Sequence, residues 1–130
     1  MTTIFMTNSL INNWQRGSVI LCQVPMPSSQ FKQFKLRPGV IISASYLNQI
    51  IDDIMIVPCT TNTHRSLTAT QYLITGDEIV RAGIRIESVV KCESILTINK
   101  SMIVRKLGAL STIAINQVNQ CLMTALELGY

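Results

Sequence analysis

The sequence lacks the residues from which metal centres are usually built. Its 130 residues include a single histidine, His64, and four cysteines that form no Cys-x-x-Cys pair. The sequence therefore does not predict a zinc site, and we expect a protein that works without a metal ion or other cofactor. Cys22, Cys59 and Cys92 fall inside apolar runs typical of strands, where cysteine acts as a small buried hydrophobe. Their placement favours a reduced, cytoplasmic protein over a disulfide framework.

Charged residues are scarce as well. They make up 14% of the chain, whereas hydrophobic residues make up 48%, and the mean hydropathy is +0.34. This composition argues against disorder and indicates that some apolar surface is buried in an oligomer. The net charge of +4 fits an anionic partner such as nucleic acid, and it fits an ordinary mildly basic protein equally well.

Signals for secretion and membrane insertion are missing too. Residues 1–15 contain no Lys or Arg with which a secretory leader would begin, and no apolar stretch approaches the length of a membrane span. We therefore expect a soluble, cytoplasmic protein with no membrane partner. The length predicts one domain, which we assign to residues 15–130, after an N-terminal tail over residues 1–14.

The apolar pattern predicts a mainly β fold with a C-terminal helix. Ser111 is a suitable N-cap, apolar residues then follow helical spacing as far as Leu126, and Gly129 suits the helix stop. Residues 76–83 have the composition of a turn-rich excursion. Runs rich in β-branched residues predict strands at 18–24, 39–44, 54–59, 70–75, 88–92, 94–98 and 103–107, with a helical turn over 46–51.

Residues 26–36 are predicted to form a polar, basic loop with two aromatic residues. Basic side chains interleaved with aromatic rings suit single-stranded nucleic acid, because cations bind phosphates and rings stack on bases. We therefore take Lys32 and Lys35 as candidate phosphate contacts and Phe31 as a candidate stacking surface. The alternative is a hairpin loop whose Phe31 and Phe34 pack on the core.

Polar groups gather at the ends of two predicted strands. Arg37 opens the second strand, and Thr60, Thr61 and Asn62 follow the third. If these strands are neighbours, a guanidinium group and several small hydrogen-bonding groups meet at one place. Arginine presents a fixed fork of donors that matches phosphate oxygens, so a phosphodiester is the expected ligand.

Several short motifs follow one another in a recognisable order. They are Arg16-Gly17, Arg37-Pro38, Pro58-Cys59-Thr60-Thr61-Asn62, Ser88-Val89-Val90-Lys91-Cys92, Thr97-Ile98-Asn99-Lys100 and Leu107-Gly108-Ala109-Leu110-Ser111. In order and spacing the chain resembles the MazF/PemK family of bacterial toxin endoribonucleases, from about residue 15 to residue 128.

The resemblance implies a small half-open β-barrel with a C-terminal helix, assembled as a homodimer. It implies metal-free, sequence-preferring cleavage of single-stranded RNA, as in mRNA interferases, and neutralisation by a cognate antitoxin. Arg37 and Thr60 stand where the family has its catalytic arginine and threonine. The chain departs from the family pattern at Ser18, at residues 94–96 and at Asn99, and we expect these departures to alter the RNA sequence that is cut more than the chemistry.

The loop after Thr60 supplies further candidates for RNA binding. Asn62 either reads a base edge or caps the turn, and we favour the turn. His64 is the side chain suited to proton transfer near neutral pH, but a solvent-exposed loop position is the interpretation that we favour. For Arg65 a phosphate contact and a solvated surface charge are equally consistent with the sequence. Thr61 completes the group of candidates.

The expected chemistry uses the nucleophile that RNA itself carries, the 2′-OH. Arg37 would stabilise the charged phosphorane, and Thr60 would bind a phosphate oxygen or orient the reacting groups. The competing hypothesis is a non-catalytic toxin or binding module of the same fold that acts on a protein target such as gyrase. The Arg37–Thr60 pair favours the enzyme, since a gyrase binder has no need of it.

Overall fold

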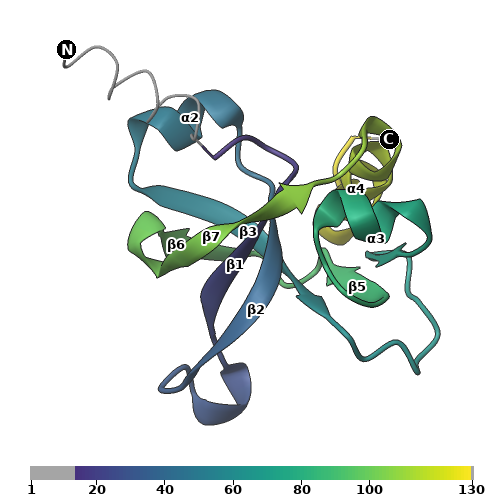
Figure 1. The fold of residues 1–130 in the computed structure, drawn as a ribbon, viewed down its shortest axis with the longest axis horizontal. Coiled ribbons are helices and arrows are strands. Elements are labelled where there is room, and N and C mark those ends of the chain that lie inside the picture. Colours follow the sequence, from purple (N-terminus) through teal and green to yellow (C-terminus); the bar gives the residue numbers. More distant parts are fainter. Residues whose placement is uncertain (1–13, 130) are drawn as a thin grey trace.

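This computed structural model describes residues 14–129. They contain seven strands, three α-helices and two short 3₁₀ helices. Figure 1 shows their arrangement. In chain order they are β1 (Ser18–Pro25), η1 (Pro27–Ser29), β2 (Phe34–Ile41), α2 (Ser45–Ile50), β3 (Asp53–Thr60), β4 (Gln71–Ile74), α3 (Asp77–Ala82), β5 (Ser88–Lys91), β6 (Leu96–Asn99), η2 (Lys100–Met102), β7 (Ile103–Ala109) and α4 (Thr112–Leu126). The predicted tail over residues 1–14 lies, apart from Trp14, outside the described residues. None of the helices described is both long and apolar enough to cross a membrane.

The strands form one antiparallel sheet in the order β4-β5-β3-β2-β1-β7, and β6 pairs with β3. β3 is the central strand. One edge of β3 pairs with β2, while its other edge pairs first with β6 through Asp53–Ile56 and then with β5 through Cys59 and Thr60. The sheet curls without closing, because β4 and β7 remain its two ends. The mainly β fold, half-open barrel and C-terminal helix expected from the sequence are confirmed.

Two apolar cores lie on opposite faces of the central strands. Neighbouring residues alternate between them: Val19, Val40 and Val57 belong to the core under α4, while Ile20, Ile41 and Ile56 belong to the core inside the curled sheet. A strand that is buried on both faces needs apolar residues at every position. This explains why the sequence shows nearly continuous apolar runs rather than alternation.

The β1–β2 hairpin differs from the sequence-based prediction. β2 begins at Phe34 and ends at Ile41, so the predicted strand over 39–44 starts too late and the predicted loop over 26–36 is too long. Only residues 26–33 connect the two strands, and Arg37 lies inside β2 rather than at its start. β1 and β2 pair from Val19–Val40 out to Pro25–Phe34, so the hairpin extends well away from α2 and α4 (Figure 1).

The predicted turn over residues 76–83 is wrong, because this segment forms helix α3. Gly76 precedes the helix, and Gly83 ends it in the left-handed conformation with φ of 73°. Asp77 and Glu78 lie in the first turn and Arg81 in the last, which matches the helix dipole. Glu78 then accepts hydrogen bonds from the backbone N–H of Ser111, at 3.1 Å, and from the Ser111 hydroxyl.

The C-terminal helix α4 begins as predicted and ends earlier. The Ser111 hydroxyl accepts a hydrogen bond from the backbone N–H of Ala114 at 3.2 Å, which is an N-cap contact. The helix stops at Glu127, which has φ of 54°, rather than at Gly129. Leu126, predicted as part of the apolar face, is exposed.

Candidate active site

The candidate site lies where β2 and β3 stop pairing. Their register runs Ile41–Ile56, Val40–Val57 and Gly39–Pro58 and ends there. Pro38 and Pro58 both lack the N–H donor with which a ladder continues. Continuing the register by two residues puts Arg37 opposite Thr60. The two residues singled out by the sequence therefore face each other across the point where the strands separate.

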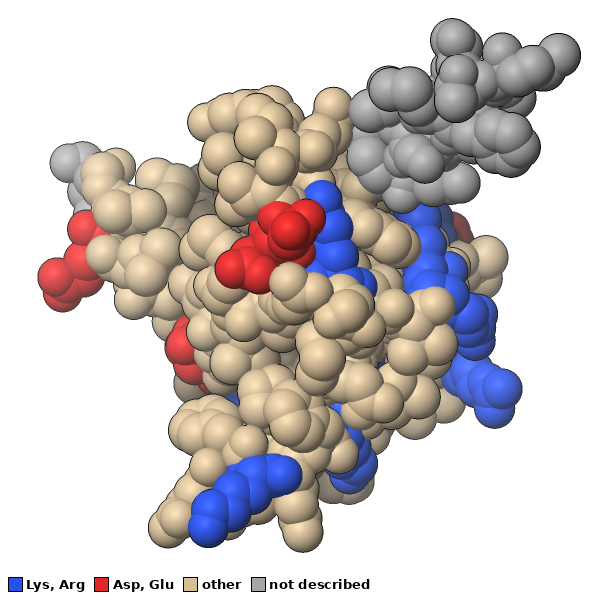
Figure 2. All heavy atoms as spheres, turned by 90° about the vertical axis from the view of Figure 1, so that its left-hand side faces the viewer, with Lys and Arg blue, Asp and Glu red and all other residues tan. Residues whose placement is uncertain are grey.

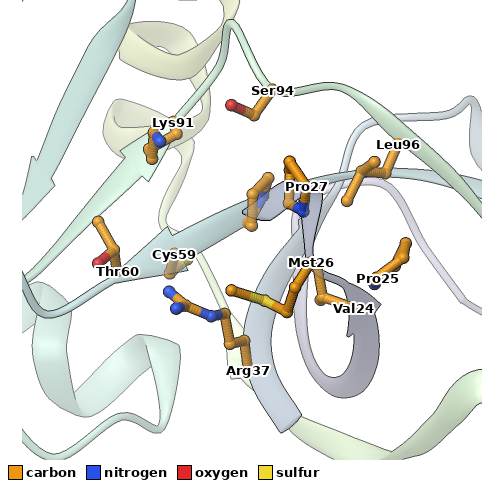
Figure 3. A pocket seen from close by; sticks show the side chains of 11 residues that line it. Val24, Pro25, Met26, Pro27, Arg37, Cys59, Thr60, Lys91, Ser94 and Leu96 are labelled. Atoms are coloured by element: carbon orange, nitrogen blue, oxygen red, sulfur yellow. The ribbon is translucent and has the colours of Figure 1, made fainter. Parts of the chain in front are cut away.

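A cavity of about 250 Å³ opens beneath the hairpin at this point, and we call it the hairpin cavity. Figure 3 shows the Arg37 guanidinium pointing from β2 toward the end of β3, with Lys91 approaching from β5. The polar lining of the hairpin cavity consists of Arg37, Thr60, Lys91 and Ser94. Its apolar walls come from Val24, Pro25, Met26, Pro27, Pro58, Cys59 and Leu96. The cavity thus combines two cationic groups and two hydroxyls with apolar surface.

The Arg37 side chain carries an unsatisfied donor. Its Nε is buried and has no hydrogen-bond partner among the described residues. A buried donor without an acceptor costs about 1–3 kcal/mol, and such groups are uncommon in folded proteins. An anionic oxygen bound in the cavity would satisfy this donor. A guanidinium held in this way is suited to a phosphate group.

The Thr60 hydroxyl is oriented by the turn that follows it. Its Oγ1 accepts a hydrogen bond from the backbone N–H of Asn62 at 3.2 Å. The hydroxyl proton is therefore left to donate to another acceptor. Asn62 takes part in the turn through its backbone N–H, while its side chain is exposed, so capping of the turn by the Asn62 side chain stays a prediction.

Most of the predicted RNA-binding residues line two further cavities that share Thr60. The outer cavity, about 490 Å³, is lined by Arg37 and Thr60 together with Lys35, Thr61, Asn62 and His64. The polar cavity, about 250 Å³, is lined by Thr60 and Asn62 together with Arg65, Gln71, Lys91 and Glu93. Arg37 also lines the hairpin cavity, so the site is continuous around the end of β3.

Phe31 and Lys32 lie apart from these cavities, at the tip of the hairpin. Phe31 is 56% exposed and Phe34 is 51% exposed, so the alternative in which both rings pack on the core is wrong. Phe31 has a positive φ of 63°, which is unusual for a bulky residue. Figure 2 shows a face made mostly of uncharged residues, with basic side chains along one edge, at the end where Figure 1 shows the hairpin, and beside an acidic group near the upper middle.

Sequence reasoning missed Lys91, Glu93 and Ser94. Lys91 ends β5, and the next residues form a turn that leads into β6. Both strands pair with the same edge of β3, so this turn passes between Ile56 and Cys59 of β3, and Glu93 and Ser94 each line a cavity that Thr60 also lines. A lysine that ends a four-residue strand of otherwise small and apolar residues was the available signal for Lys91. Nothing local in the sequence marks Glu93 or Ser94.

The thiol of Cys59 is not a nucleophile of this site. Burial, with a smaller contribution from Cys22, raises the pKa of Cys59 to about 12, so the thiol stays neutral at physiological pH. All four cysteines are free and buried. Among the described residues, no group of three or more His, Cys, Asp or Glu side chains is placed to hold a metal ion.

Comparisons with known proteins point to one family. Residues 15–126 match the family model of PemK-like, MazF-like toxins of type II toxin–antitoxin systems. The chain is also similar to a mycobacterial endoribonuclease solved in complex with its cognate antitoxin, with 23% identity, a TM-score of 0.72, and coverage of 89% of this chain and 97% of that chain. No match to a curated protein sequence was found.

Two further solved structures share the fold. The toxin MazF-mt6 of Mycobacterium tuberculosis is 22% identical, with a TM-score of 0.71 and coverage of 87% of this chain and 99% of that chain. A MazF from Deinococcus radiodurans is 14% identical, with a TM-score of 0.70 and coverage of 89% and 98%. At these identities the likeness shows the fold.

Proposed function

Because the chain belongs to the PemK-like, MazF-like toxin family of type II toxin–antitoxin systems, we propose that it is an endoribonuclease toxin that cuts single-stranded RNA without a metal ion. The observation that carries this proposal is that Arg37 and Thr60 line one cavity at the end of β3, where the buried Arg37 Nε has no acceptor among the described residues. A phosphodiester supplies that acceptor. The comparisons lend no support to the alternative of a toxin directed at gyrase.

In the proposed mechanism Arg37 and Thr60 hold the scissile phosphate. The 2′-oxygen of the preceding ribose forms a bond to phosphorus, and the bond from phosphorus to the 5′-oxygen breaks. Arg37 neutralises the negative charge that grows on the non-bridging oxygens. The Thr60 hydroxyl donates a hydrogen bond to one of these oxygens. Water takes the 2′-OH proton and protonates the departing 5′-oxygen, since guanidinium and hydroxyl groups are poor bases at neutral pH.

The RNA strand is proposed to run through the outer cavity. Lys35, Thr61, Asn62 and His64 line it beside Arg37, and Arg65 follows on the same loop. Lys32 and Phe31 on the hairpin would contact the strand farther from the cut.

Family membership also supports a cognate antitoxin that blocks the toxin, sequence-preferring cleavage of the mRNA interferase type, a homodimer and a cytoplasmic location. Exposed apolar side chains such as Ile86 and Val104 support association with a second copy. Sedimentation at micromolar concentration tests the dimer, and a monomer would contradict it.

The experiment that tests the function is incubation of a long single-stranded RNA with the purified protein in EDTA. We expect discrete fragments that end in a 2′,3′-cyclic phosphate or 3′-phosphate and begin with a 5′-hydroxyl. RNA that carries 2′-deoxyribose at the cut should stay intact, because the nucleophile is missing. A strict requirement for Mg²⁺, or cutting of the deoxy-substituted strand, would contradict the proposal.

A further inference from the structure

The polar cavity beside Thr60 has no part in the proposed chemistry, yet it is organised around a carboxylate. Glu93 accepts hydrogen bonds from the Thr70 hydroxyl at 3.0 Å and from Gln71 Nε2 at 2.9 Å. Thr70 is in turn hydrogen bonded to Thr68 at 2.9 Å. These contacts join the start of β4 to the turn after β5. They fix the position of both carboxylate oxygens at the cavity wall.

The Glu93 carboxylate is ionised and accessible. Burial alone would raise the pKa of Glu93, but hydrogen bonds from Gln71, the backbone and Thr70, with the charge of Lys91, outweigh burial and hold this pKa below its usual range. The residue is exposed. Each carboxylate oxygen has two lone pairs, and Thr70 and Gln71 take one on each oxygen. Because the side chain is exposed, the carboxylate is open to a ligand on its solvent side.

A fixed carboxylate does not suit a second phosphate, because the two negative charges repel each other. It suits the N–H donors of a base. Guanine presents two adjacent donors, N1–H and the 2-amino group, with the O6 acceptor beside them. Adenine, cytosine and uracil each offer a single donor group next to an acceptor on that edge. Lys91 and Arg65 line the same cavity and can donate to O6.

We propose, on the basis of the function proposed above, that the polar cavity binds the base of a nucleotide that flanks the scissile phosphate, and that Glu93 selects guanine there. Thr60 lines both the polar cavity and the hairpin cavity, so a base in the polar cavity belongs to a nucleotide next to the phosphate held by Arg37 and Thr60. Glu93 is thus a specificity-determining residue rather than a catalytic residue.

The test begins with the cut sites of the wild-type protein, where we expect guanine on one fixed side of the cut. In a short RNA with one such site, inosine in place of that guanosine removes the 2-amino donor. Cleavage should slow roughly tenfold to a hundredfold, as expected for the loss of a bidentate base contact. 7-Deazaguanosine keeps both donors and O6, and it should be cut at nearly the guanosine rate.

The variant Glu93→Gln keeps the size of the side chain and removes its charge. We expect this variant to cut guanosine and inosine substrates at similar rates, while the matched control Glu127→Gln keeps the wild-type ratio. Cut sites without a flanking guanine, equal rates on guanosine and inosine with the wild type, or an unchanged ratio in Glu93→Gln would overturn the proposal.

A binding measurement separates this proposal from the proposed function. The same oligonucleotides with 2′-deoxyribose at the cut are followed by fluorescence anisotropy. Weaker binding of the inosine strand by the wild type supports the guanine site even if no RNA is cut, an outcome that would contradict only the nuclease function. Equal binding of both strands overturns the guanine site even if cleavage is found.

Discussion

Arg37 shows how a single residue gains its role from its neighbours. It lies in β2, one position before Pro38, where the pairing with β3 has ended. Its side chain therefore reaches the gap between the strands instead of packing on a continuous sheet. The unpaired Nε costs stability in the free protein, and bound phosphate would recover it.

The buried thiols predict a stability that falls at alkaline pH. Burial raises the pKa of Cys22 to about 11 and of Cys59 and Cys92 to about 12. In the unfolded chain these thiols ionise near their ordinary value of about 8.5. Between that value and about 12 the folded state therefore binds more protons. The protonated thiols therefore make their full contribution to the free energy of unfolding below about pH 8.5. This contribution decreases as pH rises, by up to about 1.4 kcal/mol per pH unit for each thiol.

Urea unfolding at pH 7.5, 9 and 10 measures this slope. The variant Cys59→Ala should show a slope shallower by about 1 kcal/mol per pH unit, apart from a constant loss from the smaller side chain. The slope is the quantity to compare, because the packing loss does not depend on pH. An identical slope in the variant and the wild type would mean that Cys59 does not couple to folding.

At the residue level the sequence predicted the site only in part. Arg37, Thr60, Lys35 and Asn62 could be found because each stands within or beside a short motif. Glu93 could not, since its position beside Thr60 arises when β5 and β6 pair with the same edge of β3. That pairing joins residues about 30 positions apart, and no local pattern encodes it.

Among the elements, the β1–β2 hairpin projects from the sheet and its loop is held by internal hydrogen bonds. The Ser29 hydroxyl donates to the Met26 carbonyl at 2.9 Å and accepts from the backbone N–H of Gln33 at 3.0 Å. Gln30 and Phe31 both adopt positive φ, which turns the chain sharply. The loop therefore holds Phe31 exposed at its tip without support from the rest of the molecule.

Replacement of Lys32 and Lys35 by alanine should weaken RNA binding similarly across sequences. Each lysine that binds a phosphate releases counterions from the RNA. The slope of log affinity against log salt should therefore become shallower by about 0.7 per lost single-strand contact. Phe31→Ala should cost roughly 1–3 kcal/mol of binding if the ring stacks on a base. Titrations at several salt concentrations measure both effects. An unchanged salt slope in the double lysine variant would show that these charges only solvate the hairpin.

The junction between α3, β7 and α4 predicts a stability effect at residues that do not line the three cavities of the candidate site. Ser111 caps α4 through Ala114 and is itself bound by Glu78. Ser111→Ala removes the cap and one of the Glu78 contacts, so it should lower the free energy of unfolding by about 1–2 kcal/mol. The exposed neighbour Thr112→Ala should change it by less than about 0.5 kcal/mol. Similar effects of the two variants in urea unfolding would contradict the capping role.

Element boundaries were harder to predict than element types. Runs of β-branched residues predicted the strands, and Ser111 predicted the start of α4. Both signals are local in the sequence. α3 was missed because glycines at both ends gave six helical residues the composition of a turn. The predicted start of β2 was too late because its first three residues, Phe34, Lys35 and Leu36, are exposed, and pairing with β1 rather than burial holds them in the strand.

As a whole, the molecule is a sheet with an apolar core on each face and a seam at which β2 separates from β3. Both cores include residues of β3, so the strand that leads to the seam is buried on both faces. Arg37 comes from β2, Thr60 from β3 and Lys91 from β5, and all three residues line the hairpin cavity. The proposed phosphate site therefore draws its side chains from three paired strands of one sheet.

The most direct test of the central claim is the single-turnover cleavage rate of a one-site RNA in EDTA. Arg37→Ala should cut about two to three orders of magnitude more slowly than the wild type, the loss typical of one charge-stabilising donor, and Thr60→Val should be similarly impaired. The control Arg81→Ala removes an exposed arginine of α3 and should cut at nearly the wild-type rate. If folded Arg37→Ala protein cuts the RNA at nearly the wild-type rate, the site between β2 and β3 is not the active site.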